Sequence, residues 1–171
     1  MLCMVLGMSS CKSTIVPQAI NTVNAVSLEE LNLRRADYSI LKTVTAEATI
    51  VCHYGSKEIR ITEENNEFSF SFIPKKKLGR MEGWEIKNFK GIARFGYLNN
   101  DYESPNIAPY PHYIVRKLAI YRIINASKIA GADGVIEPVI STNVEQGRTS
   151  KDVIYKTTVS AKLIKLNTDG K

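Results

Sequence analysis

A near-regular alternation of apolar and polar residues over 38–52 constrains the fold more than any other feature of the sequence. β-branched residues are frequent in this segment, and Thr43, Thr45 and Thr49 fall on its polar face. Its apolar side chains share the other face, interrupted only by Lys42: Tyr38, Ile40, Val44, Ala46, Ala48, Ile50 and Cys52. A period of two predicts a strand with one buried face, so the chain must build a sheet with a layer packed on it.

Further strands and one helix follow in the sequence. We expect strands at 57–62 and 67–73, a second pair at 83–88 and 91–97, and single strands at 135–142 and 152–166. Pro138 predicts that its strand lies at a sheet edge or contains a bulge. Pro111 and Gly131 delimit a helix over about 111–130. The sequence therefore predicts an α+β fold, with an antiparallel or mixed sheet and one long helix packed on one face.

The predicted helix is apolar on more than one side. One broad face consists of Ile114, Val115, Leu118, Ala119, Ala126, Ile129 and Ala130. Ile120 and Ile124 project from the other side, and a helix of this kind is usually buried on both sides. A loop, the N-terminal segment or another subunit could cover the second side. Ile120 and Ile124 are therefore the candidate residues for an interface between subunits.

The first residues of the chain resemble a bacterial lipoprotein signal. A short apolar run ends in Met8, Ser9 and Ser10, and Cys11 and a polar stretch follow. In such signals the cysteine is acylated and becomes the mature N-terminus, so Cys11 is the predicted lipidation site. We therefore divide the chain into a truncated signal peptide (1–10), a lipidated tether (11–27), a single α+β domain (28–167) and a polar tail (168–171). A ragged N-terminus with a stray cysteine is the alternative.

Export would determine the location and the partners of the domain. The segment after Cys11 lacks an acidic run, which by resemblance to other lipoproteins favours an outer-membrane anchor facing the periplasm. The net charge is +6, but export argues against nucleic acid as a partner. The densest basic cluster is Lys75, Lys76, Lys77 and Arg80. It is either a solvated loop or a contact with anionic headgroups, in addition to the lipid anchor that holds the protein at the membrane.

The sequence shows no arrangement of residues that predicts catalysis or metal binding. Cys52 and His53 are adjacent, but neighbouring strand residues point to opposite faces, so a buried, inert Cys52 is expected. No histidine and cysteine spacing forms a metal site, and no cofactor is predicted. Glu47, Glu58 and Asp133 are single carboxylates without an evident partner, whereas acid–base catalysis needs positioned groups. The chain is therefore not expected to be an enzyme.

Three segments resemble the YbjQ-like family. The segment Tyr38–Ala48 is similar to its opening strand, Ala119–Ile136 to its helix and Gly-Ala-Asp turn into a strand, and Tyr155–Val159 to its closing strand. A similar helix, turn and strand occur in small envelope lipoproteins of the Rcs-sensor type. The resemblance implies a helix on one face of a sheet and implies homo-oligomers. Lys156 replaces the glycine that the family has in its last strand.

The sequence is compatible with two functions. The first is a non-catalytic, membrane-anchored envelope lipoprotein whose domain binds an unidentified envelope protein or assembles with itself. The second is a module that binds a small ligand or a lipid through the aromatic face formed by Phe68, Phe70 and Phe72. A pocket beside these rings would favour the second function, whereas close packing would remove it.

Overall fold

A computed structural model describes residues 16–23, 33–98 and 107–167 of the chain. The predicted lipidation site Cys11, most of the predicted tether and the polar tail lie outside these residues. A single α-helix and a 3₁₀ turn occur among the described residues, together with eight strands. In chain order the elements are β1 (Gln18–Val23), η1 (Arg35–Asp37), β2 (Tyr38–Tyr54), β3 (Ile59–Glu63), β4 (Phe68–Lys77), β5 (Arg80–Gly91), β6 (Ala93–Leu98), α1 (Pro111–Ile129), β7 (Gly134–Gln146) and β8 (Asp152–Leu166).

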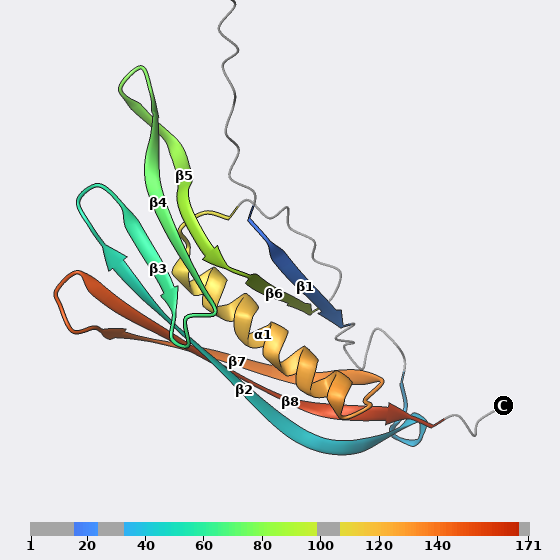
Figure 1. The fold of residues 1–171 in the computed structure, drawn as a ribbon. Coiled ribbons are helices and arrows are strands. Elements are labelled where there is room, and N and C mark those ends of the chain that lie inside the picture. Colours follow the sequence, from blue (N-terminus) through green and yellow to red (C-terminus); the bar gives the residue numbers. More distant parts are fainter. Residues whose placement is uncertain (1–15, 24–32, 99–106, 168–171) are drawn as a thin grey trace, which may run out of the picture.

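The strands form two sheets of unequal size. Six strands make an antiparallel sheet in the order β5-β4-β3-β2-β8-β7, and β1 pairs with β6 in a small parallel sheet. Helix α1 lies between them, as Figure 1 shows, and contacts β2 and β8 on one side and β1 and β6 on the other. The α+β prediction is therefore confirmed in its outline, although the 19-residue helix is short beside the large sheet.

The core is the layer between the helix and the large sheet. The alternation in β2 places Ala48, Ile50 and Cys52 on the inner face, where each is at most 1% exposed. From the helix, Val115 and Leu118 pack against this face in the same cluster. A register shift between Ile40 and Lys42 interrupts the predicted face, because an extra residue at Leu41 reverses the alternation. Tyr38 consequently joins a separate small cluster with Ile136 and Ile164.

The second side of the helix is covered by the chain itself. Ile120 is 3% exposed and Ile124 is 0% exposed, so both belong to the core. Their prediction as interface residues is wrong, because the small sheet of β1 and β6 packs against this side of α1. Strand β1 comes from the segment predicted as a tether, which was one of the alternatives for this cover. In contrast, Ile129, which the sequence assigns to the broad apolar face of the helix, is 89% exposed at the helix end.

Gly96 allows β6 to lie close to the helix backbone. A Cβ atom built on Gly96 would lie 2.2 Å from the backbone nitrogen of Tyr121. No side chain fits at that distance, so glycine is required where the strand crosses the helix. Asn21 on β1 donates a hydrogen bond to Asn125 of α1 over 2.6 Å and accepts one from Lys128. These contacts fix the small sheet to the helix.

The strand predictions differ in their accuracy. Strand β8 has the predicted bounds, and the expected bulge in β7 occurs between Ile136 and Val139, on an edge strand. The predicted pairing of 83–88 with 91–97 is wrong. Strand β5 pairs with β4, and β6 pairs with β1, because the chain changes sheets at Gly91 and Ile92. The distant strand β1 supplies the partner of β6, which local patterns do not indicate.

Candidate functional site

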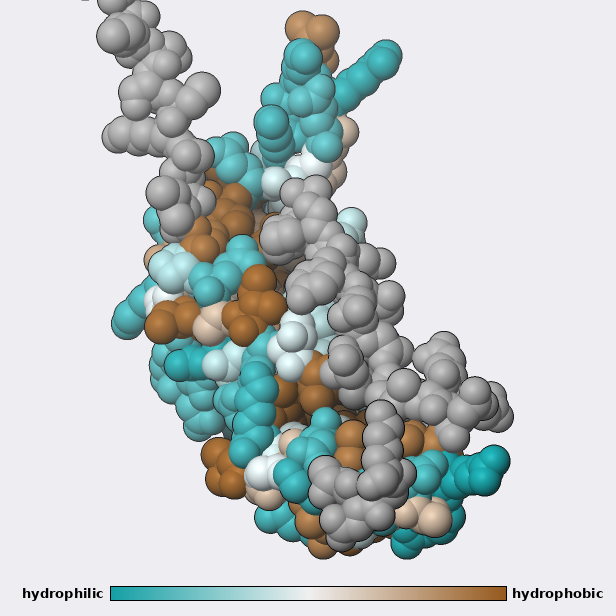
Figure 2. All heavy atoms as spheres, turned by 90° about the vertical axis from the view of Figure 1, so that its right-hand side faces the viewer, coloured by the Kyte–Doolittle hydropathy of each residue, from teal (hydrophilic) through white to brown (hydrophobic). Residues whose placement is uncertain are grey.

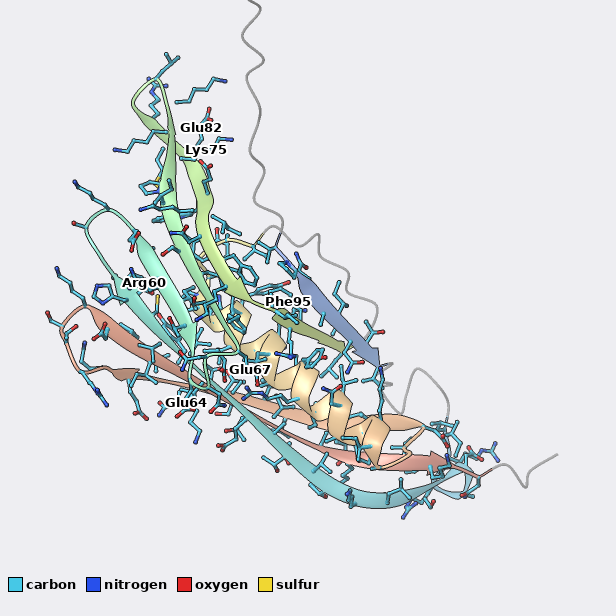
Figure 3. The ribbon with its side chains drawn as sticks, viewed as in Figure 1. Arg60, Glu64, Glu67, Lys75, Glu82 and Phe95 are labelled. Atoms are coloured by element: carbon cyan, nitrogen blue, oxygen red, sulfur yellow. The ribbon has the colours of Figure 1, made fainter. Side chains whose placement is uncertain are left out.

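The β4–β5 hairpin projects from the body of the protein. Strand β3 pairs with β4 only over Ser69 to Phe72, so the rest of β4 has β5 as its sheet neighbour. The ribbon therefore extends beyond the sheet as two strands, which Figures 1 and 3 show at the upper end of the molecule. Figure 3 shows Lys75 and Glu82 on this extension, far from Glu64 and Glu67 at the opposite turn.

The tip of the hairpin is a two-residue turn with an unusual residue. Lys77 pairs with Arg80, so Leu78 and Gly79 form the whole connection. Their φ angles are 50° and 78°, which are the two positive values that a type I′ turn needs. Asparagine or glycine normally occupies the first position, because a left-handed conformation costs other residues roughly 1–2 kcal/mol. Leucine at this position therefore lowers stability.

Leu78 is also almost entirely exposed. Its relative exposure is 97%, and Met81 on the adjoining strand is 55% exposed. Figure 2 shows hydrophobic atoms at the very end of a projection, directly above hydrophilic ones. Neither strain nor exposure of this leucine benefits the fold. A residue that costs stability and packs against nothing points to a contact outside the chain.

Basic side chains surround this apolar tip. The cluster singled out by the sequence lies at the end of β4 and the start of β5, and all of its members are exposed: Lys75, Lys76, Lys77 and Arg80. Glu82 is the acidic residue nearest to them in sequence. In the described part of the chain, none of the four cations makes an ion pair. The charges are therefore available to an anionic partner.

A polar hollow lies away from the hairpin tip, beside the C-terminal end of β3, where the pairing of that strand with β2 ends. Its volume is about 370 Å³, and its charged lining includes Glu47, Arg122 and Lys156. Lys156 Nζ lies 2.9 Å from Glu47 Oε2, which lowers the pKa of that carboxyl and raises the pKa of the lysine. Arg122 donates hydrogen bonds to the Glu47 carbonyl oxygen and to the Glu63 carboxylate, both over 2.8 Å. These charged groups bind one another, which indicates a structural role.

Cys52 and His53 point in different directions. Cys52 is buried, as predicted, and burial raises the pKa of its thiol. His53 Nδ1 lies 2.6 Å from Asp152 Oδ1, and this contact, together with hydrogen bonds from Thr149, lowers the pKa of the carboxyl. Among residues 16–23, 33–98 and 107–167, no three or more His, Cys, Asp or Glu side chains form a group that could hold a metal ion.

The aromatic face proposed for ligand binding is part of the core. Phe68, Phe70 and Phe72 are each at most 1% exposed. Phe70 lies between its neighbours, with ring centroids 5.3 Å and 5.5 Å away, and contacts Phe89 at 4.8 Å. The rings are close-packed, so they offer no surface to a ligand and the prediction of such a face is wrong.

The apolar part of the candidate site is not evident from the sequence pattern. The predicted strands end at residue 73 and begin again at 83, so Leu78 and Met81 fall in a loop between them. Gly79 was the available signal, because a glycine between two charged strand ends is typical of a two-residue hairpin. The leucine before this glycine does not indicate a type I′ turn, because asparagine or glycine is the usual residue at that position.

Comparison of the chain with family models, curated proteins and solved structures finds no significant match. In the described ranges, α1 does not have the length and apolar character that a membrane-crossing helix needs.

Proposed function

We propose that this protein is a non-catalytic, membrane-anchored lipoprotein of the cell envelope whose β4–β5 hairpin binds anionic lipid headgroups. The observation that carries the proposal is the tip of that hairpin, where the 97% exposed Leu78 stands among four exposed cations. Basic residues near an anionic surface each contribute about 1 kcal/mol. An apolar tip adds affinity by leaving water for the interface between headgroups and acyl chains.

The position of β1 supports this arrangement. Gln18, the first residue of β1, pairs with Ala93, and the Ala93 nitrogen donates to the Pro17 carbonyl oxygen over 3.0 Å. Ala93 directly follows the base of the hairpin, so a chain leaving β1 toward Cys11 departs beside that base. The segment from Cys11 to Gln18 can reach at most about 25 Å when extended. A lipid on Cys11 would therefore hold the domain close to the membrane, on the side where the hairpin rises (Figure 1).

The lipid anchor, the periplasm-facing outer membrane and the YbjQ-like resemblance remain predictions from the sequence. Labelling with a palmitate analogue tests the anchor directly. A chain expressed from the full-length gene is expected to incorporate the label, and the Cys11→Ala variant is not. Equal labelling of the two chains would contradict lipidation at Cys11.

Vesicle co-sedimentation of the unlipidated chain tests the hairpin. The full chain with Cys11→Ser is mixed with neutral phosphatidylcholine vesicles, or with vesicles that contain phosphatidylglycerol as well. We expect binding to the anionic vesicles and a loss of binding at high salt, because salt screens exposed charges. Replacing Lys75, Lys76 and Lys77 together by glutamine should weaken binding about a hundredfold, at about 1 kcal/mol for each lysine.

A matched control distinguishes the effect of the hairpin lysines on vesicle binding from the effect of the overall net charge. Lys42, Lys90 and Lys151 are exposed lysines away from the hairpin tip, and their replacement by glutamine changes the net charge by the same amount. This control triple should bind anionic vesicles nearly as well as the parent chain. Equal losses in the two triple variants, or equal binding to neutral and anionic vesicles, would refute the proposal.

A further inference from the structure

Strand β7 leaves one side of the large sheet open. It is the last strand in the sheet order and pairs with β8 on one side, while no other described strand lies along its second side. The residues from Ser141 to Gln146 are all exposed, and Val144 is 54% exposed. An edge strand of this kind presents unpaired backbone groups that can pair with another strand.

The hydrogen-bond pattern shows which backbone groups face outward. The Tyr54 nitrogen donates to the Lys151 carbonyl oxygen, and the Gly147 nitrogen donates to the Asp152 carbonyl oxygen, both over 2.8 Å. Because pairing alternates along an antiparallel ladder, these bonds direct the N–H and C=O groups of Ile140, Thr142 and Val144 away from β8. The Val144 nitrogen agrees with this assignment, since it donates to the side chain of Asn143 instead of to β8.

We propose that β7 pairs with β7 of a second copy of this chain, antiparallel and in a register centred on Thr142. In this register Ile140 lies opposite the partner's Val144, and the two Thr142 residues face each other across the twofold axis. Both copies direct the same three outward residues to the contact, so each outward N–H group can donate to a C=O group of the partner. The Val144 N–H group then exchanges the Asn143 side chain for the carbonyl oxygen of the partner's Ile140. The two six-stranded sheets then join into one continuous sheet.

The side chains of β7 fit this register on both faces. On the inner face, β-branched residues oppose β-branched residues, a pairing that stabilises antiparallel strands. On the outer face, Ser141 lies opposite the partner's Asn143, and Val139 lies opposite the partner's Glu145. No two like charges face each other. Pro138 and the bulge before Val139 end the pairing on that side, because proline has no N–H group to donate.

The other open edge of the sheet is less suited to such pairing. Strand β5 contains charged residues along most of its length, namely Arg80, Glu82, Glu85, Lys87 and Lys90, and its pairing with β4 has two register shifts. Charged residues and irregular pairing are the features by which proteins protect edge strands from association. In β7 the part from Val139 to Gln146 has Glu145 as its one charged residue and pairs regularly with β8.

Analytical ultracentrifugation of the full chain with Cys11→Ser over a wide concentration range tests the proposal. We expect a weak dimer, because two edge strands bury less area than a standard interface. Val144→Lys should raise the dissociation constant at least about tenfold, because it places a charge against the partner's Ile140. Val139→Lys should lower it, because the new lysine faces the partner's Glu145. A monomer at all concentrations, or the same loss in both variants, would overturn the proposal.

Disulfide trapping tests the register. In the proposed dimer Ser141 and the partner's Asn143 form a non-hydrogen-bonded pair with Cα atoms about 4.5 Å apart, which a disulfide can bridge. The Ser141→Cys and Asn143→Cys variants are made in a chain with Cys3 and Cys11 replaced by serine, then mixed and oxidised by copper phenanthroline. Dimers in the mixture that exceed those of either variant alone support the register. Equal trapping in all three samples contradicts it. Vesicle binding by the hairpin is measured separately, and the results of the dimer experiments do not affect it.

Discussion

Arg122 Nη2 lies 2.8 Å from Glu63 Oε1, and the Glu63 side chain is entirely buried. The same guanidinium also contacts Glu67 Oε1 over 3.1 Å. Glu63 accepts further hydrogen bonds from the backbone nitrogens of Asn65 and Glu67, so its carboxylate organises the β3–β4 turn. Through these contacts one helix residue fixes the turn to α1 at the point where β3 ends.

Removing Arg122 should destabilise the protein strongly. We expect Arg122→Met to lower the free energy of unfolding by about 3 kcal/mol, because breaking a buried ion pair leaves one charge without its partner. Urea unfolding monitored by circular dichroism measures the change. The exposed Arg116 on the same helix provides the control, and Arg116→Met should have an effect of less than about 0.5 kcal/mol. Similar losses in the two variants would contradict a specific role of Arg122.

The sequence predicts those parts of the fold that depend on local patterns. Alternation defines β2 and β8, and Pro111 and Gly131 delimit α1 nearly to the residue. The sequence does not predict a contact that depends on a segment far away in the chain. In the sequence, Ile120 and Ile124 look available for a partner because the small sheet that covers them forms only when β6 pairs with β1, which lies about a hundred residues before the helix. No local period indicates that β6 would leave β5 for this strand.

The candidate site shows the same division. The cluster of Lys75, Lys76, Lys77 and Arg80 is visible as a run of charges, so the sequence identifies it. The role of Leu78 depends on its backbone conformation, with a φ of 50°, and on the projection of the whole ribbon. Both follow from the pairing of β4 with β5 beyond the end of β3, which is a tertiary feature. The basic run in the sequence therefore predicts only a charged surface. The apolar tip beside it is evident only from the structure.

Gly96→Ala tests the close approach of β6 to the helix. The added methyl group would meet helix backbone at 2.2 Å, which no side-chain rotation can relieve. We expect a loss of at least about 3 kcal/mol in the free energy of unfolding, at the upper end of the range for overpacking. Gly131→Ala is the control, because its surroundings are open and its φ of 66° costs only about 1 kcal/mol. Equal losses would show that the contact between β6 and α1 can relax.

Asp133 should stabilise the fold in a pH-dependent manner. Its carboxylate lies 2.7 Å from Lys165 Nζ and accepts a hydrogen bond from the Leu166 nitrogen over 2.9 Å. The lysine contact first, and the backbone hydrogen bond second, lower the pKa of Asp133 below its ordinary value of 3.8. The unfolded chain therefore binds the proton more readily, and the stabilisation is complete above that value and lost as the pH falls toward the folded pKa.

The Asp133→Asn variant measures this contribution. At pH 7 it should unfold at a lower urea concentration than the parent chain, and the difference should shrink as the pH falls below 3.8. Glu82→Gln changes the net charge equally at an exposed position and should unfold like the parent at pH 7. A gap between the Asp133→Asn variant and the parent that stays constant down to the lowest pH would contradict the role assigned to the Asp133 charge.

Leu78→Asn should make the protein more stable and its membrane binding weaker. Asparagine tolerates the left-handed conformation of the turn, so we expect a gain of about 0.5–1 kcal/mol in the free energy of unfolding. The same substitution removes the apolar tip and should reduce vesicle binding about tenfold, because the tip no longer enters the interface.

Leu78→Ala separates the two effects, since it removes the apolar bulk but retains a residue that is strained at a φ of 50°. Both variants should bind vesicles equally poorly, whereas only Leu78→Asn should be stabilised. If Leu78→Asn binds anionic vesicles as well as the parent chain, the exposed leucine has no part in membrane contact, and the lysines alone would account for binding.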